Sequence, residues 1–274
     1  MTFQGSIRFA LRMALGAGAV VLVAVVALID RGQRLDLLHP ELVTGWVLLA
    51  AVVFLALLNV RKKLSMVPVG RASDWVAAHV VLGVVVIVIY GFHARTIWPS
   101  GYELALALLF YAVILSGLIG YLLQRMAPAS LANLGYEVIW ERIPAELADM
   151  RERIEASILE CARETGSEVL PRLYREELAW YFRRPRFVLA SLVGTGASSS
   201  WVHHRLDSVS IYLRGKEIEH ATFLRECARR KVHIDRAYAI QGLLKCWLLV
   251  HVPATYGFLV LVLWHLILVH VYLV

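Results

Sequence analysis

Four histidines in the most apolar parts of the chain share one spacing. His79 and His93 are fourteen residues apart, and so are His251 and His265. Fourteen residues of α-helix make almost four full turns and advance about 21 Å, so each pair places two imidazoles on one helix face at two depths. Imidazole is the commonest metal ligand, and an ionisable group inside a bilayer is costly unless something satisfies it. The spacing therefore predicts two layers of metal-binding histidines.

The equal spacing also predicts which histidines face each other. If the two helices run in the same direction, His79 is level with His251, and His93 is level with His265. Facing imidazoles can fill both axial positions of an iron porphyrin. We therefore predict two b-type haems, each with bis-histidine ligation.

Two further residues near these histidines suit the same cofactor. Gly83 lies one turn from His79 on the same face, and glycine lets a bulky group approach a helix closely. Arg95, just beyond the outer end of this helix, can pair with a haem propionate or serve equally well as an interfacial anchor. His270 is five residues past His265 and points away from its face, so we expect a polar helix end there.

The chain has five long apolar runs, and the four histidines lie in or at the end of the third and fifth of them. Of the 274 residues, 59% are hydrophobic, whereas soluble domains have about half. The runs long enough to cross a hydrocarbon core of about 30 Å are 13–29, 43–60, 75–92, 104–123 and 246–274. The first exceeds a signal-peptide core and no small-residue cleavage site follows it, so we interpret it as a retained helix. The fold class expected is an all-α integral membrane protein with a haem-binding bundle.

A polar insertion separates the fourth and fifth runs. The domain organisation expected is transmembrane helices one to four in 1–124, a mostly helical insertion in 125–245, and transmembrane helix five in 246–274. The strongest cluster of positive residues in a short loop lies between the second and third runs. It consists of Arg61, Lys62, Lys63 and Arg71. Because cytoplasmic loops are enriched in Lys and Arg, the N-terminus and the insertion are predicted to be cytoplasmic, with the C-terminus at the outer face of the inner (plasma) membrane.

The insertion itself contains a clear helical pattern. Five apolar positions recur at intervals of three and four, which indicates one buried helix face. They are Leu147, Met150, Ile154, Ile158 and Cys161. Further helices are expected over 169–182 and from Lys216 onward, and a loop over 194–200 that continues through His203 and His204.

The net charge of +7 has a membrane explanation. Lys and Arg gather beside the apolar runs, where they meet anionic headgroups, so membrane lipid and no nucleic acid is the expected partner. The basic clusters 183–186 and 229–231 are expected to face headgroups or an acidic partner.

The residues around the histidines resemble a known family. Histidines separated by thirteen residues on one helix also occur in the cytochrome b subunits of quinol-oxidising complexes, and their place on the third and fifth runs is similar to the ferric-reductase-like transmembrane domain. The resemblance is carried by 75–79 (WVAAH), 91–95 (GFHAR), 251–253 (HVP) and 264–265 (WH). It covers the membrane half and implies haem b without specifying a substrate. The reductases of that group continue into a sixth helix and a flavin and nicotinamide domain, whereas this sequence ends with the fifth run, so direct NADPH oxidation by this chain is not expected.

The function expected is that of a dihaem cytochrome b subunit that transfers electrons across the membrane within a larger redox complex. The sequence has no flavin, nicotinamide or iron–sulfur motif, so flavin, iron–sulfur or cytochrome c proteins are the expected partners, and quinone is a candidate electron donor or acceptor. One alternative is a stand-alone transmembrane ferric or quinone reductase fed by a soluble donor. Another is a non-haem membrane scaffold or transporter whose histidines carry protons or metal ions.

Overall fold

The structure is a computed structural model that describes most of the chain as helix. The residues described are 3–35, 40–63, 71–94, 96–132, 138–194 and 197–273, and they contain no strand. The chain forms two compact units. Unit 1 comprises Met1–Tyr121 and Leu249–Val274, and unit 2 comprises Leu122–Leu248.

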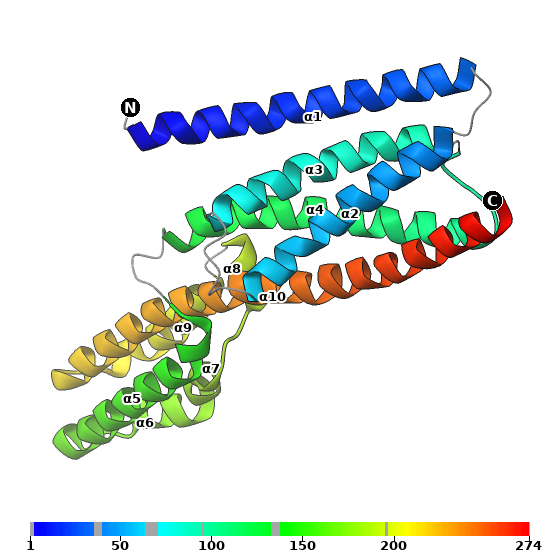
Figure 1. Ribbon diagram of the computed structural model, residues 1–274. Coiled ribbons are helices and arrows are strands. Elements are labelled where there is room, and N and C mark those ends of the chain that lie inside the picture. Colours follow the sequence, from blue (N-terminus) through cyan, green and yellow to red (C-terminus); the bar gives the residue numbers. More distant parts are fainter. Residues whose placement is uncertain are drawn as a thin grey trace. The chain divides into compact units, whose positions relative to one another are not determined.

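Long apolar helices build unit 1 (Figure 1). They are α1 (Phe3–Leu35), α2 (Pro40–Lys63), α3 (Ala72–His93), the first part of α4 (Tyr102–Ala132) and the last part of α10 (Lys216–Leu273). Each of these five helices contains a stretch long and apolar enough to cross a membrane. The prediction of an all-helical chain with five such helices is confirmed.

The outward faces of unit 1 are apolar. Val20, Leu28, Leu115 and Val260 all have 60–69% of their surface exposed. In water so much exposed apolar surface would favour aggregation, whereas in a membrane it would contact lipid chains that are equally apolar. The outward faces are therefore compatible with a multi-pass membrane protein.

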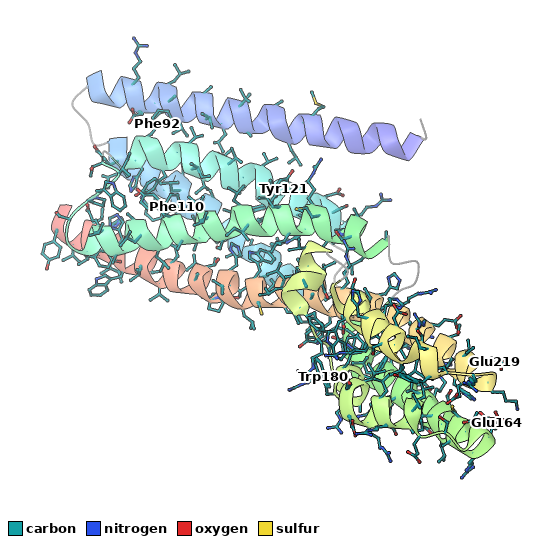
Figure 2. The ribbon with its side chains drawn as sticks, turned by 180° about the vertical axis from the view of Figure 1, so that it is seen from behind. Phe92, Phe110, Tyr121, Glu164, Trp180 and Glu219 are labelled. Carbon is teal, nitrogen blue, oxygen red and sulfur yellow. The ribbon has the colours of Figure 1, made fainter. Side chains whose placement is uncertain are left out.

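The directions of the helices in unit 1 decide which histidines can face each other. Helices α3 and α10 run in the same direction, and α4 runs opposite to both (Figure 1). Phe110 of α4 is buried against Phe258 of α10, and its side chain lies inside the bundle (Figure 2). Tyr102 at the start of α4 donates a hydrogen bond to the carbonyl of Leu261. The parallel arrangement that the histidine pairing needs is thus present.

Unit 2 is a small helical domain with its own core. Its helices are α5 (Ile143–Thr165), α6 (Val169–Leu173), α7 (Ala179–Arg183), α8 (Val188–Val193), α9 (Ala197–Val209) and the first part of α10. The predicted stripe of five apolar residues on α5 is buried, which confirms that helix face. The helix expected over 169–182 is present as α6 and α7, joined by one wider helical turn, Tyr174–Leu178.

The loop predicted from 194 through His204 is wrong for most of its length. Helix α9 begins at Ala197 and contains both His203 and His204, and Val202 beside them is fully buried. Gly194 does lie outside a helix, because its positive φ of 76° ends α8. Small polar residues favour loops and helix starts alike, so the serines here could not distinguish the two.

The expectation that the cluster 229–231 faces outward is wrong for one residue. Arg229 and Arg230 are exposed, but Lys231 is fully buried and its Nζ lies 2.7 Å from Oδ2 of Asp235, which is also fully buried. The same Nζ lies 4.1 Å from the ring centroid of Tyr181. Three successive helix residues cover about 200° of arc, so the third of them turns inward.

Candidate functional site

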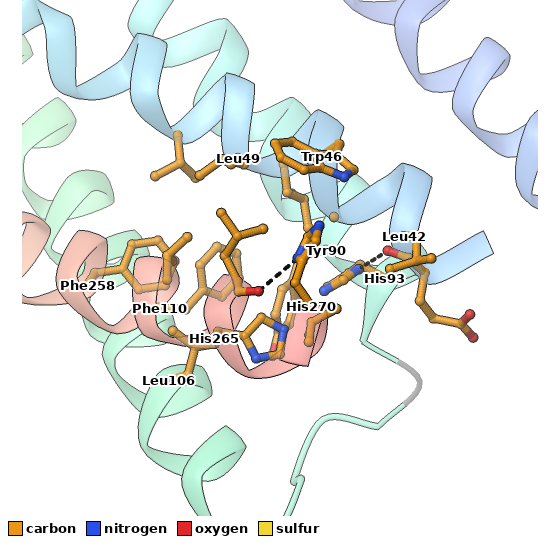
Figure 3. A pocket seen from close by; sticks show the side chains of 17 residues that line it. Leu42, Trp46, Leu49, Tyr90, His93, Leu106, Phe110, Phe258, His265 and His270 are labelled. Carbon is orange, nitrogen blue, oxygen red and sulfur yellow. Dashed lines mark hydrogen bonds between the residues drawn. The ribbon is translucent and has the colours of Figure 1, made fainter. Parts of the chain in front are cut away.

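The structure brings His93 and His265 together inside unit 1. His93 ends α3 and His265 lies near the end of α10, and their ring centroids are 6.3 Å apart with the ring planes at 87°. Both line a hollow between α2, α3, α4 and α10 whose empty space, counted with its open side, is about 760 Å³. The two imidazoles and the surrounding apolar side chains are seen in Figure 3. These are the two histidines that the sequence predicts to face each other in one of the two layers, the layer that the predicted topology places at the outer face.

Most of the side chains that surround the two histidines in this hollow are apolar. Leu106, Phe110, Phe258 and Val262 are among the side chains that face it. Pockets for cofactors are typically apolar with a few placed polar groups. Here the placed polar groups include the two imidazoles.

The ring of His93 is held by α2. Its Nδ1 lies 3.1 Å from the carbonyl oxygen of Glu41 and 3.2 Å from Oγ1 of Thr44. A carbonyl oxygen can only accept, so Nδ1 carries the proton and Nε2 keeps its lone pair. Metal-binding histidines are usually oriented in this way, by a hydrogen bond from the ring nitrogen that does not bind the metal.

Gly45 lets α2 approach this ring. A Cβ at position 45 would lie 3.1 Å from Cε1 of His93, closer than carbon atoms pack without displacement. Thr44 and Gly45 therefore act as one unit, a hydroxyl beside Nδ1 and a glycine beside Cε1.

His251 is held by α4 in a similar manner. Oγ of Ser116 donates to the carbonyl of Val113 at 2.9 Å and lies 2.8 Å from Nδ1 of His251. The hydroxyl of Ser116 therefore lies between the backbone of α4 and the ring of His251. A Cβ at Gly117 would lie 3.6 Å from Cε1 of the same ring.

The two hydroxyl–glycine pairs were missed by reasoning from sequence. Thr44-Gly45 and Ser116-Gly117 each stand inside an apolar run, and that interruption was the available signal. Helix propensity and hydropathy treat both pairs only as weak points in a span. Their partners, His93 and His251, are 49 and 135 residues away in sequence.

The inner layer remains a prediction. His79 and His93 stand on the unbroken helix α3, and His251 and His265 stand on α10, which continues through Pro253. Because α3 and α10 run in the same direction, a step of fourteen residues back from the observed pair leads to His79 and His251 at one level, about 21 Å away.

Predictions from the sequence also concern Gly83, Arg95 and His270. A Cβ at Gly83 would have no atom within 4 Å, so this face of α3 leaves room for a bulky group. Arg95 lies outside the described residues. The expectation that His270 points away is wrong, because it lines the same hollow as His265 and contacts the ring of Trp46. The hollow is open at its side, so residues from more than one face of α10 line it.

Two imidazoles alone are an incomplete site for a bare metal ion. Within the described part of the chain, no group of three or more His, Cys, Asp or Glu side chains could hold one. A planar metal complex that carries its own equatorial ligands would need only two axial nitrogens, and the imidazoles of His93 and His265 can offer those. Comparison with family models, curated proteins and solved structures finds no match to this chain.

Proposed function

We propose that this chain is a dihaem cytochrome b that carries electrons across a membrane as a subunit of a larger redox complex. His93 and His265 would hold the outer haem, and His79 and His251 the inner one. The observation that carries the proposal is the pair His93 and His265, which stands where the shared spacing of fourteen residues predicts it.

The distance between these two rings supports axial ligation of one iron. Two imidazoles bound on opposite sides of a metal at about 2 Å have ring centroids about 6 Å apart, and the centroids of His93 and His265 are 6.3 Å apart. Perpendicular ring planes are compatible with this, because each axial ring can rotate about its own metal bond. The residues present therefore fit the group.

The hydrogen bonds support the same assignment. Nδ1 of His93 donates to the carbonyl of Glu41, which is the usual orientation of a metal-binding histidine, and Nδ1 of His251 lies 2.8 Å from Oγ of Ser116. A bound haem would supply reversible one-electron transfer. The chain's own contribution is to orient the rings, exclude water and set the polarity around them.

An absorption spectrum of the purified full chain tests this proposal. We expect the reduced-minus-oxidised spectrum of a b-type cytochrome and two haems per chain. His265→Ala and His251→Ala should each lower the content to one haem. His204→Ala, at an exposed position of α9, is the control and should keep both.

The spectrum, together with an assay of ferric and quinone reduction, separates the proposal from its alternatives. Absence of a b-type spectrum would refute haem binding and leave a non-haem membrane scaffold or transporter. Two haems together with steady reduction of ferric iron or quinone by the chain alone, fed by a soluble donor, would instead identify a stand-alone reductase. Two haems that survive both histidine substitutions would refute the ligand assignment.

A further inference from the structure

Helix α8 of unit 2 presents an apolar face that its own unit does not cover. Leu189 and Val193 are four residues apart, hence on one side of the helix, and are 80% and 78% exposed. Ser191 is buried on the other side. Phe187 and Val188, just before and at the start of α8, are 36% and 37% exposed. The apolar face made by Leu189 and Val193 is called here the α8 face.

Positive charge directly precedes the α8 face in the sequence. Arg183 and Arg184 are exposed, and in the described part of the chain neither forms an ion pair. Arg186 stacks over the ring of Trp180 at 4.7 Å, and Trp180 is itself 37% exposed. Arginine and tryptophan next to exposed leucine and valine are the composition of segments that lie in a membrane interface.

Two contacts show which part of α10 lies next to α8. The backbone N–H of Arg186 donates to Oδ1 of Asp235 at 3.4 Å, and a Cβ at Gly194 would lie 3.4 Å from Nη1 of Arg236. From Arg236 to Lys245, the last charge before the apolar run of α10, is nine residues or about 14 Å. The α8 face therefore lies at the end of unit 2 from which α10 continues into its apolar run.

The opposite end of unit 2 has a different character. Lys216 begins α10 and pairs with Glu164 at the end of α5, with Nζ to Oε1 at 2.9 Å. Glu164 and Glu219 lie together at this end (Figure 2). Along α10, the apolar surface and its arginines thus lie near Asp235 and Arg236, and the carboxylates lie near Lys216.

We propose that the α8 face and the preceding arginines form an interfacial anchor on anionic lipid. Leu189 and Val193 insert among the acyl chains, while Arg183 and Arg184 bind headgroup phosphates. The anchor holds unit 2 against the bilayer at a point other than its two helical connections. This inference does not depend on haem binding.

Photo-crosslinking of the full chain in lipid nanodiscs tests the anchor. A benzophenone amino acid replaces Leu189 in one variant and Ile211 in the control. Ile211 is 84% exposed on the turn Ser210–Tyr212, five residues before Lys216 at the opposite end of unit 2. In nanodiscs of phosphatidylglycerol and phosphatidylcholine, we expect the yield of lipid adduct at 189 to exceed that at 211 by about tenfold, because only side chains within the interface meet acyl chains.

The charge requirement is tested on the same adduct. With phosphatidylglycerol omitted, or with Arg183→Gln and Arg184→Gln, the yield at 189 should fall by about fivefold for each arginine that no longer binds an anionic headgroup. Equal yields at 189 and 211 would overturn the anchor. So would an adduct at 189 to a second copy of the chain in place of lipid, which would identify the α8 face as a dimer contact.

Discussion

At the scale of single residues, two of the four histidine rings lie against glycines of neighbouring helices. Gly45 faces His93, and Gly117 faces His251. In each case the preceding residue has a hydroxyl near Nδ1 of the same ring. The hydroxyls and glycines of α2 and α4 therefore orient imidazoles that belong to α3 and α10.

Gly45→Val is expected to disturb His93 without unfolding the bundle. Its Cβ would start 3.1 Å from Cε1 of His93 and two further methyl groups would enlarge the overlap, so the ring must move. We expect haem content to fall from two to one per chain, measured by reduced-minus-oxidised spectra. The control is Gly91→Val on α3, where a Cβ meets no atom within 4 Å and both haems should remain. Equal spectra for the two variants would contradict the role given to Gly45.

At the scale of helices, unit 2 is stabilised by polar contacts that lie in very different surroundings. Lys231 and Asp235, one turn apart on α10, are both fully buried. The ion pair between Lys216 and Glu164 is largely exposed. Burial removes water from the first pair, so removing one partner there leaves a charge without solvent, whereas water screens the second pair.

Lys231→Met is expected to destabilise unit 2 strongly. The carboxylate of Asp235 would stay buried without its ammonium partner, at a cost of about 3–5 kcal/mol. The double variant Lys231→Met, Asp235→Leu should recover most of that stability because no charge remains. Denaturant unfolding of the full chain in detergent measures both, with the exposed Arg229→Met as control. A double variant as unstable as the single one would show that packing against Tyr181 matters more than the charge.

Glu164 gives unit 2 a pH-dependent contact. Its hydrogen bond from Lys216 lowers the pKa of the Glu164 carboxyl below its usual value. A group whose pKa is lowered by folding contributes stability above its unfolded pKa and loses it as pH falls through the folded value. The stability difference between the native chain and Lys216→Met should therefore be small at pH 7 and vanish towards pH 3. A difference that grows on acidification would contradict this.

The helices could be predicted from the sequence more completely than the side-chain contacts between them. The apolar stripe of α5 and the five long runs follow from periodicity and length alone. The start of α9 could not be predicted in this way, because the serines before Trp201 suit a loop as well as a first helical turn. Lys231 was expected outside because it follows two exposed arginines. Its burial depends on Asp235 and Tyr181, and the contact with Tyr181 comes from a part of the chain 50 residues away. Likewise, the spacing of the histidines predicted the outer pair, while Thr44 and Ser116 became visible only in three dimensions.

At the scale of the whole molecule, the chain combines a bundle whose outward faces are apolar with a helical domain that has its own core. Unit 1 exposes apolar side chains, and unit 2 has its own buried core from α5 to α10. The positive loop before α3 predicts that unit 2 is cytoplasmic. The end of α10 then lies at the outer face.

Reporter fusions check this orientation. Alkaline phosphatase, which folds only outside the cytoplasm, should be active when fused after residue 273 and inactive when fused after Gly215. Green fluorescent protein at the same positions should give the reverse pattern. The opposite result at both positions would invert the topology and place the outer hollow on the cytoplasmic side.

Because α10 is one unbroken helix, the positions of His251 and His265, the two histidines proposed as ligands on it, are fixed relative to each other by the helical rotation. No loop interrupts the described helix between Lys216 and Leu273, so an inserted residue would have to be accommodated within the helix itself. One extra alanine ahead of His251 would turn everything beyond it by about 100° and lift it by about 1.5 Å relative to the preceding turns. Length variation should therefore be tolerated better at the connection between α5 and α6, residues 166–168, than within α10.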